Sequence, residues 1–234
     1  RTCKRAPAGH FEKLSSLTFA GRAFPVPSDI EKYLALRYGS WKETVTPWDT
    51  NRDDGAILSA AELSSFSRNT KCTKPKPFTK KVKLEGKNLL NARAILSDVI
   101  EILERNGIIY WLDEGTLLGI IRGGDLIPWD HDLDISVHGD SAARLLEIRN
   151  QFPPRYVLRP HFDNSGRIPR GALRVCRVKS IFGWTAQFKK LEELKMDVFI
   201  KYKLGGAYDW IDSHTHKRVD AHFYDNLDKV TYAG

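Results

Sequence analysis

Three alternating aspartates, Asp130, Asp132 and Asp134, constrain the fold of this chain more than any other feature. The interleaved residues Leu133 and Ile135 are apolar. This period of two predicts a β-strand with one face on the core and the carboxylates on the other. Carboxylates so close together repel one another unless a cation lies among them. Because Mg²⁺ and Mn²⁺ prefer oxygen ligands, the pattern favours a metal site over a solvated strand face.

A glycine-threonine turn precedes this strand. The apolar segment Ile108–Leu112 predicts a short strand, and Gly115 and Thr116 then open a helix. Backbone N–H groups and a hydroxyl at a helix start are suited to binding phosphate, although a plain helix cap has the same sequence. Arg122 lies between the turn and the aspartates and is a candidate phosphate ligand, with a surface arginine as the alternative.

Further candidates lie later in the chain. Asp197 is a lone acid in an apolar segment, and a buried acid is costly unless it is paired or bound to metal. We therefore expect Asp197 to complete the site from a neighbouring strand. Arg170 and Arg174 follow a polar loop, where they form either a basic wall for a phosphate or ordinary surface charge. His216 is expected to lie in a solvent-exposed turn.

The rest of the chain alternates between helical and strand periodicity. Helices are predicted over Ile30–Gly39, Ala56–Phe66, Leu89–Leu103, Gly115–Ile121 and Ser141–Gln151, and strands over Ile108–Leu112, Leu133–Val137, Arg155–Arg159, Ala172–Lys179 and Met196–Tyr202. This mixture predicts an α+β or α/β domain with a mixed sheet.

Two distant segments resemble each other and predict an internal repeat. Thr2–Phe11 reads TCKRAPAGHF and Thr215–Phe223 reads THKRVDAHF, and each continues to an aromatic-Ala-Gly sequence. We therefore expect residues 1–50 to be the tail of one domain copy, 51–83 a basic linker and 84–234 the catalytic body of a second copy. The chain is then a slice of a tandem protein, or a permuted domain whose front segment supplies the missing tail.

The net charge of +8 favours an anionic partner, such as a phosphate-bearing substrate, a glycan phosphate, nucleic acid or a membrane surface. No apolar stretch approaches the roughly 18 to 20 residues of a membrane span. Three cysteines, Cys3, Cys72 and Cys176, are far apart and form no CxxC pair, which argues against a structural zinc site.

Taken together, the motifs resemble the LicD family, which includes bacterial phosphocholine transferases and the animal fukutin and fukutin-related proteins. The resemblance is carried by Asp113–Gly119, Arg122–Gly124 and Ile127–Ile135. It covers about residues 84–202, and residues 24–45 resemble the C-terminal tail of that family.

The resemblance implies a nucleotidyltransferase-like fold, a mixed sheet flanked by helices, with Mg²⁺ or Mn²⁺ as the cofactor. Its implied reaction transfers a phospho-alcohol group, of the phosphocholine or ribitol-phosphate type, from a CDP-linked donor to a hydroxyl of a glycan or glycoprotein. Nucleic acid is not expected as a partner. A fukutin-like animal protein would act in the Golgi lumen, and a bacterial LicD-like protein in the cytoplasm.

The family's functional positions fall on residues already singled out. Gly115 and Thr116 take the phosphate-binding turn, and Asp132 and Asp134 are the main metal ligands. Asp130 is a neighbour or third ligand, and Asp197 is the later strand acid; either of these two is a candidate to accept the proton of the attacking hydroxyl. The alternatives are a nucleotidyltransferase with another small-molecule or nucleic-acid acceptor, and a catalytically inactive glycan-binding copy in a tandem protein.

Overall fold

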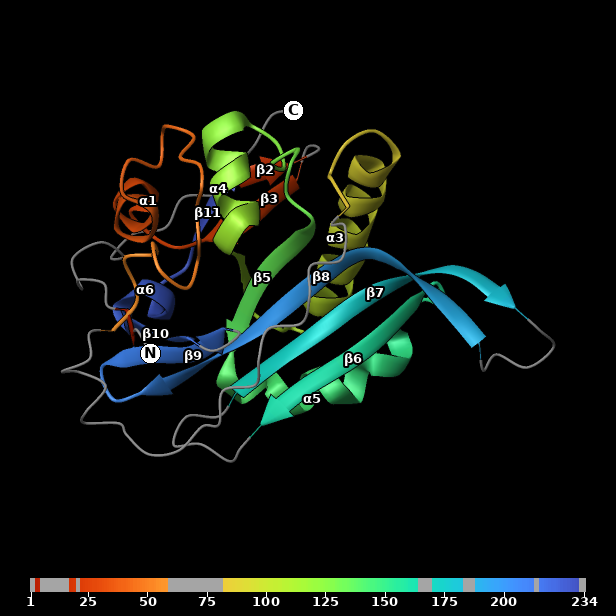
Figure 1. The fold of residues 1–234 in the computed structure, drawn as a ribbon. Helices are drawn as coiled ribbons and strands as arrows, with labels where there is room; N and C mark the ends of the chain where they lie inside the picture. The colour runs from red at the N-terminus through yellow and green to blue at the C-terminus, as the bar shows by residue number, and fades with distance from the viewer. Residues whose placement is uncertain are drawn as a thin grey trace.

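The computed structural model describes residues 3–4, 17–19, 22–58, 82–163, 170–182, 188–212 and 215–231. A large sheet has the strand order β1-β10-β9-β8-β5-β4, with β7 and then β6 added on β8, and a small sheet has the order β11-β3-β2 (Figure 1). The strands are β1 (Cys3–Lys4), β2 (Leu17–Phe19), β3 (Arg22–Val26), β4 (Tyr110–Leu112), β5 (Asp132–His138), β6 (Tyr156–Asp163), β7 (Arg170–Phe182), β8 (Phe188–Leu204), β9 (Ala207–Asp212), β10 (Thr215–Asp220) and β11 (Asp228–Thr231). The helices are α1 (Ile30–Tyr38), α3 (Lys87–Arg105), α4 (Glu114–Gly123), α5 (Ala142–Glu147) and α6 (His222–Asp225).

The large sheet is mixed, which confirms the predicted α+β class. Strand β5 runs parallel to β8 and antiparallel to β4, while β7 and β9 pair with β8 in the antiparallel sense. Within the described residues, no helix is both long enough and apolar enough to cross a membrane.

Most of the predicted elements of the body are present, with different ends. Strands β7 and β8 are longer than predicted, and α5 is short because 3₁₀ turns at Gly139–Ser141 and Ile148–Gln151 flank it. Strands β9, β10 and β11 were not predicted. The helix predicted over Ala56–Phe66 is wrong in its described part, because residues 56–58 form a turn and an isolated bridge from Ile57 to Lys217. Its remaining residues lie outside the described part of the chain.

Alternate side chains of β5 project to opposite faces of the sheet. Leu133, Ile135 and Val137 are fully buried in the core, and α3 packs against β5 and β8. Figure 1 shows α3 and α5 behind the sheet, which leaves the face that carries the alternate residues of β5 turned toward the viewer. Asp132 and Asp134 lie on this second face, as their alternation predicts.

The N-terminal segment packs into the same core as the body. Strand β3 pairs with β11, and α1 buries Tyr33 and Leu34. Cys3 of β1 lies opposite His216 of β10 in a parallel pair, and the predicted repeat aligns the same two residues. The repeat itself stays a prediction. The division into tail, linker and body stays a prediction.

The cysteine Cys176 is a buried free thiol.

A buried cluster of charges joins α1 to the start of α4. The guanidinium of Arg37 is fully buried and donates two hydrogen bonds to Asp54, at 2.8 and 2.7 Å, and another to Glu114. The ammonium of Lys217, on β10, lies 3.2 Å from Asp54 and 3.6 Å from Glu114. Burial opposes the charge of the guanidinium, but Asp54 and Glu114 hold the pKa of Arg37 well above its ordinary value. The N-terminal segment is thus tied to the body by ion pairs that water does not screen.

Replacing Arg37 with leucine should lower the free energy of unfolding by about 3 to 5 kcal/mol, because Asp54 and Glu114 would stay buried with less compensating charge. Arg52 is the matched control, since it also pairs with a carboxylate, Asp53, in the same segment but is largely exposed. Arg52→Leu should change stability by less than about 1 kcal/mol. Urea unfolding of both variants measures the difference, and equal losses would contradict a structural role for the buried cluster.

Candidate active site

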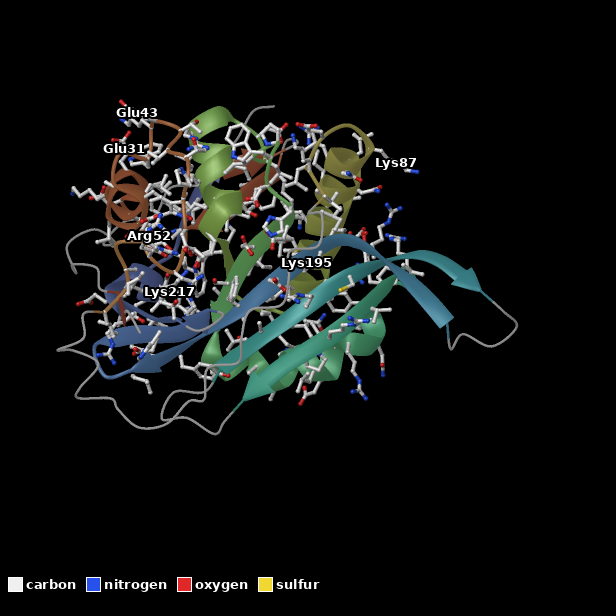
Figure 2. All side chains as sticks on the ribbon, in the orientation of Figure 1. Glu31, Glu43, Arg52, Lys87, Lys195 and Lys217 are labelled. Carbon is white, nitrogen blue, oxygen red and sulfur yellow. The ribbon has the colours of Figure 1, made fainter. Side chains whose placement is uncertain are left out.

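The parallel pairing of β5 with β8 assembles the acidic centre. The register places Asp132 opposite Lys195 and Asp134 opposite Asp197, so all four side chains project from the same face of adjacent strands. Carboxylate oxygens of Asp132, Asp134 and Asp197 lie within 4.8 Å of one another. A second group with the spacing of metal ligands consists of Asp130, His131 and Asp132. The structure therefore brings together the four predicted acids, and Figure 2 shows the labelled Lys195 on the same face.

The turn after β4 closes one side of this centre. Asp113 caps α4 by accepting a hydrogen bond from the N–H of Glu114 at 2.9 Å. A Cβ atom on Gly115 would lie 2.5 Å from an Asp130 carboxylate oxygen, so a larger residue here would require the Asp130 side chain to move. Thr116 is buried, and its hydroxyl accepts a hydrogen bond from the N–H of Asp134 at 2.8 Å. The threonine thus fixes the turn to the acidic strand.

Buried polar groups beneath the turn hold Asp113 in place. Its carboxylate accepts hydrogen bonds from Tyr33 at 2.6 Å, from Ser136 at 2.7 Å and from Lys201. Although burial opposes ionisation, Lys201 and Arg37 hold the pKa of Asp113 below its ordinary value. Lys201 in turn lies 3.7 Å from the centroid of the Trp210 ring. The capping carboxylate therefore stays charged, which orients the start of α4.

The acids of the centre differ in how their charge is compensated. Asp132 contacts Lys195 and lies 3.3 Å from the His131 ring nitrogen Nε2. The carboxylate of Asp134 has no cationic partner among the described residues, and burial together with Asp132, Asp130 and Asp197 raises its pKa well above the ordinary value. The ionised Asp134 is therefore the acid that would gain most from an added cation.

Asp197 is already paired. Arg174 donates to both of its oxygens, at 2.6 and 2.9 Å, and Lys195 lies 3.0 Å from Oδ2. Burial opposes the charge, but the hydrogen bonds from Arg174 and the charge of Lys195 keep the pKa of Asp197 below its ordinary value. Arg174 is about one-third exposed, so the pair lies at the edge of the site where solvent reaches it.

The other predicted residues lie farther from the acids. Arg122 is near the end of α4, six residues beyond Thr116, and its Nη1 lies 3.5 Å from the carbonyl oxygen of Glu43. Arg170 begins β7 opposite Asp163 in the register, and its side chain lies outside the described part of the structure. The exposed turn expected at His216 is wrong: this residue is in β10, largely buried, with Nε2 2.6 Å from Asp209.

Sequence reasoning missed three cations of this region: Lys195, Lys201 and Arg37. A local signal existed for the first, because Lys195 and Asp197 alternate as Asp132 and Asp134 do. The other two are fully buried charges, and their partners at the start of α4, Asp113 for Lys201 and Glu114 for Arg37, lie 88 and 77 residues away in the chain, so no local pattern reveals these pairs.

The sequence of the chain is similar to those of known proteins. The family model for the LicD/FKTN/FKRP nucleotidyltransferase domain matches residues 107–234. The human protein named Ribitol 5-phosphate transferase FKRP is 28% identical over 139 residues, which are 58% of this chain and 26% of that protein. An uncharacterised protein of Rickettsia prowazekii is 40% identical over 73 residues, 31% of this chain and 27% of that protein.

The Lipopolysaccharide cholinephosphotransferase LicD of Haemophilus influenzae is 43% identical over 47 residues, 20% of this chain and 18% of that protein. In these three alignments the chain spans about a quarter or less of the relative's length.

Neutralising two neighbouring acids should have opposite effects on stability. Asp134→Asn should raise the free energy of unfolding by about 1 kcal/mol at pH 7 in EDTA, because the raised pKa means that the ionised carboxylate destabilises the fold above the ordinary aspartate range. Asp197→Asn should lower it, because the lowered pKa of Asp197 means that its ionised carboxylate, paired with Arg174 and Lys195, stabilises the fold. Urea unfolding compares the two variants with the parent protein, and a loss of stability in Asp134→Asn would contradict the assignment.

Proposed function

This chain belongs to the LicD/FKTN/FKRP nucleotidyltransferase-domain family, and we propose that it is a metal-dependent transferase that moves a phospho-alcohol group from a CDP-linked donor to a glycan hydroxyl. The relatives whose names state an activity are a ribitol 5-phosphate transferase and a cholinephosphotransferase, and both names describe transfer of a phosphorylated alcohol. The observation that carries the proposal is the cluster of Asp132, Asp134 and Asp197 beside the turn at Gly115.

The donor set fits a hard divalent cation. It consists of carboxylate oxygens within 4.8 Å of one another, and Mg²⁺ and Mn²⁺ prefer such ligands. Asp132 and Asp134 would hold the ion, with Asp130 as a neighbouring ligand, because both oxygens of Asp197 already accept hydrogen bonds from Arg174. When bound, the ion would supply positive charge to the diphosphate of the donor and to the leaving nucleotide.

The residues around the acids would orient the two substrates. The start of α4 presents backbone N–H groups at Gly115 and Thr116, where the helix dipole favours an anion such as a phosphate. Arg174 lies at the exposed edge of the acidic centre and still has guanidinium N–H groups beyond the two that bind Asp197. These groups would hold the donor phosphates with the phosphorus toward the open face of the sheet.

Asp130 is the better candidate to accept the proton of the attacking hydroxyl. It precedes β5 and is partly exposed, so an acceptor substrate can reach it. Asp197, the alternative, accepts hydrogen bonds from Arg174 and Lys195, and its lowered pKa makes it a weaker base. The proton would move to Asp130 as the hydroxyl oxygen attacks the phosphorus and the bond to the cytidine nucleotide breaks.

Binding of CDP-choline, CDP-ribitol and CDP-glycerol with and without Mn²⁺ tests the proposal by calorimetry. We expect at least one compound to bind, and the combined variant Asp132→Asn, Asp134→Asn to lose at least 10-fold in affinity, because the metal-dependent contact to phosphate is removed. Asp140→Asn, an exposed acid beyond the opposite end of β5, is the control and should bind as the parent does. Absence of binding to all three compounds, or equal binding by the double variant, would overturn the proposal.

A further inference from the structure

The ammonium of Lys195 lies among the carboxylates of the acidic centre. It contacts Asp132 and lies 3.0 Å from Oδ2 of Asp197, and these two acids form the metal-capable group with Asp134. Lys195 is largely buried, and Figure 2 shows it at the middle of the sheet rather than at its margin. One positive charge is therefore already present where carboxylate ligands converge.

This position follows from the strand register. Lys195 is directly opposite Asp132, and it precedes Asp197 by two residues on the same face of β8. A parallel pair in this register cannot bring Asp197 to Asp134 without also bringing Lys195 to Asp132. The lysine is thus a fixed part of the centre, although its four-carbon side chain leaves the ammonium free to move.

The charge distribution in the centre is uneven. Lys195 and Arg174 compensate Asp132 and Asp197, whereas Asp134 has no cationic partner within the described residues. A divalent ion that bound Asp134 and Asp132 would lie close to the ammonium. Like charges a few ångströms apart repel each other. This repulsion favours movement of the ammonium away from Asp132 when such an ion binds.

Cations of the neighbouring strands lie beside Lys195. Arg174 on β7 is opposite Asp197, two residues from Cys176, which is the β7 partner of Lys195. On β6, Arg159 lies opposite Arg174 and is exposed. A row of cations thus runs from the acids toward the open edge of the sheet. An anionic group that contacts the ion at Asp132 and Asp134 would meet this row on its other side.

We propose that Lys195 is an internal counter-ion that binds Asp132 and Asp197 in the metal-free protein and binds the diphosphate of the substrate once a divalent ion has displaced it. The exchange makes and breaks only ion pairs, and the proton stays on the lysine throughout. It rests on the proposed function in two respects, that a divalent ion binds at Asp132 and Asp134 and that a diphosphate is the anion. The side chain of Lys195 should therefore weaken the binding of the divalent ion and strengthen the binding of the diphosphate.

The test uses the whole chain with Mn²⁺ alone and then with inorganic pyrophosphate at saturating Mn²⁺. Lys195→Met should bind Mn²⁺ about 10-fold more tightly than the parent, because the competing charge is gone, and should bind pyrophosphate about 10-fold more weakly. Lys203→Met is the control: it removes a lysine of the same strand that is half exposed and paired with Asp225, so both affinities should stay at parent values. Electron paramagnetic resonance of free Mn²⁺ and calorimetry give the two constants.

A Lys195→Arg variant keeps the test decisive if the methionine variant does not fold. It retains the charge, so Mn²⁺ should bind no more tightly than to the parent. Mn²⁺ affinity in Lys195→Met equal to or below that of the parent, tighter Mn²⁺ binding by Lys195→Arg, or unchanged pyrophosphate affinity in Lys195→Met would overturn the proposal. If no CDP-linked compound binds but the Mn²⁺ and pyrophosphate results hold, the donor assignment fails and the role of Lys195 stands.

Discussion

Repulsion among carboxylates at the junction of β5 and β8 is the constraint on which the rest of the site depends. Asp132, Asp134 and Asp197 are brought within 4.8 Å of one another by a parallel strand pair, and Asp130 lies at the entrance of the same strand. Such a group costs free energy unless positive charge compensates it. Arg174 and Lys195 supply part of that charge, and the part that is missing is at Asp134.

A second cluster of charges serves a different purpose. Arg37, Lys201 and Lys217 face Asp54, Asp113 and Glu114, and all six side chains are buried. Their ion pairs connect α1, the start of α4 and two strands of the large sheet. Because this cluster holds Asp113 and Glu114, it sets where the backbone of Gly115 lies relative to the acids. The N-terminal segment therefore contributes to the geometry of a site to which it supplies no predicted ligand.

Local patterns predicted the parts of the fold that depend on neighbouring residues. The alternation in β5, the periodicity of α3 and the turn at Gly115 are each visible within a few residues of sequence, and each element is present. The same reasoning identified Asp197 from its apolar surroundings. Local sequence patterns could not predict the register of β5 on β8, because this register pairs residues about sixty positions apart in the chain. Without the register, nothing distinguishes Lys195 from the other lysines, and the ion pair between Arg174 and Asp197 cannot be predicted.

Anomalous diffraction from crystals grown with Mn²⁺ would locate the divalent ion in the acidic centre. We expect an anomalous peak about 2.0 to 2.3 Å from carboxylate oxygens of both Asp132 and Asp134, with the ammonium of Lys195 no longer in contact with Asp132. A Mn²⁺ peak that lies away from Asp134, or an acidic centre in which Lys195 still bridges Asp132 and Asp197 at saturating Mn²⁺, would contradict this expectation.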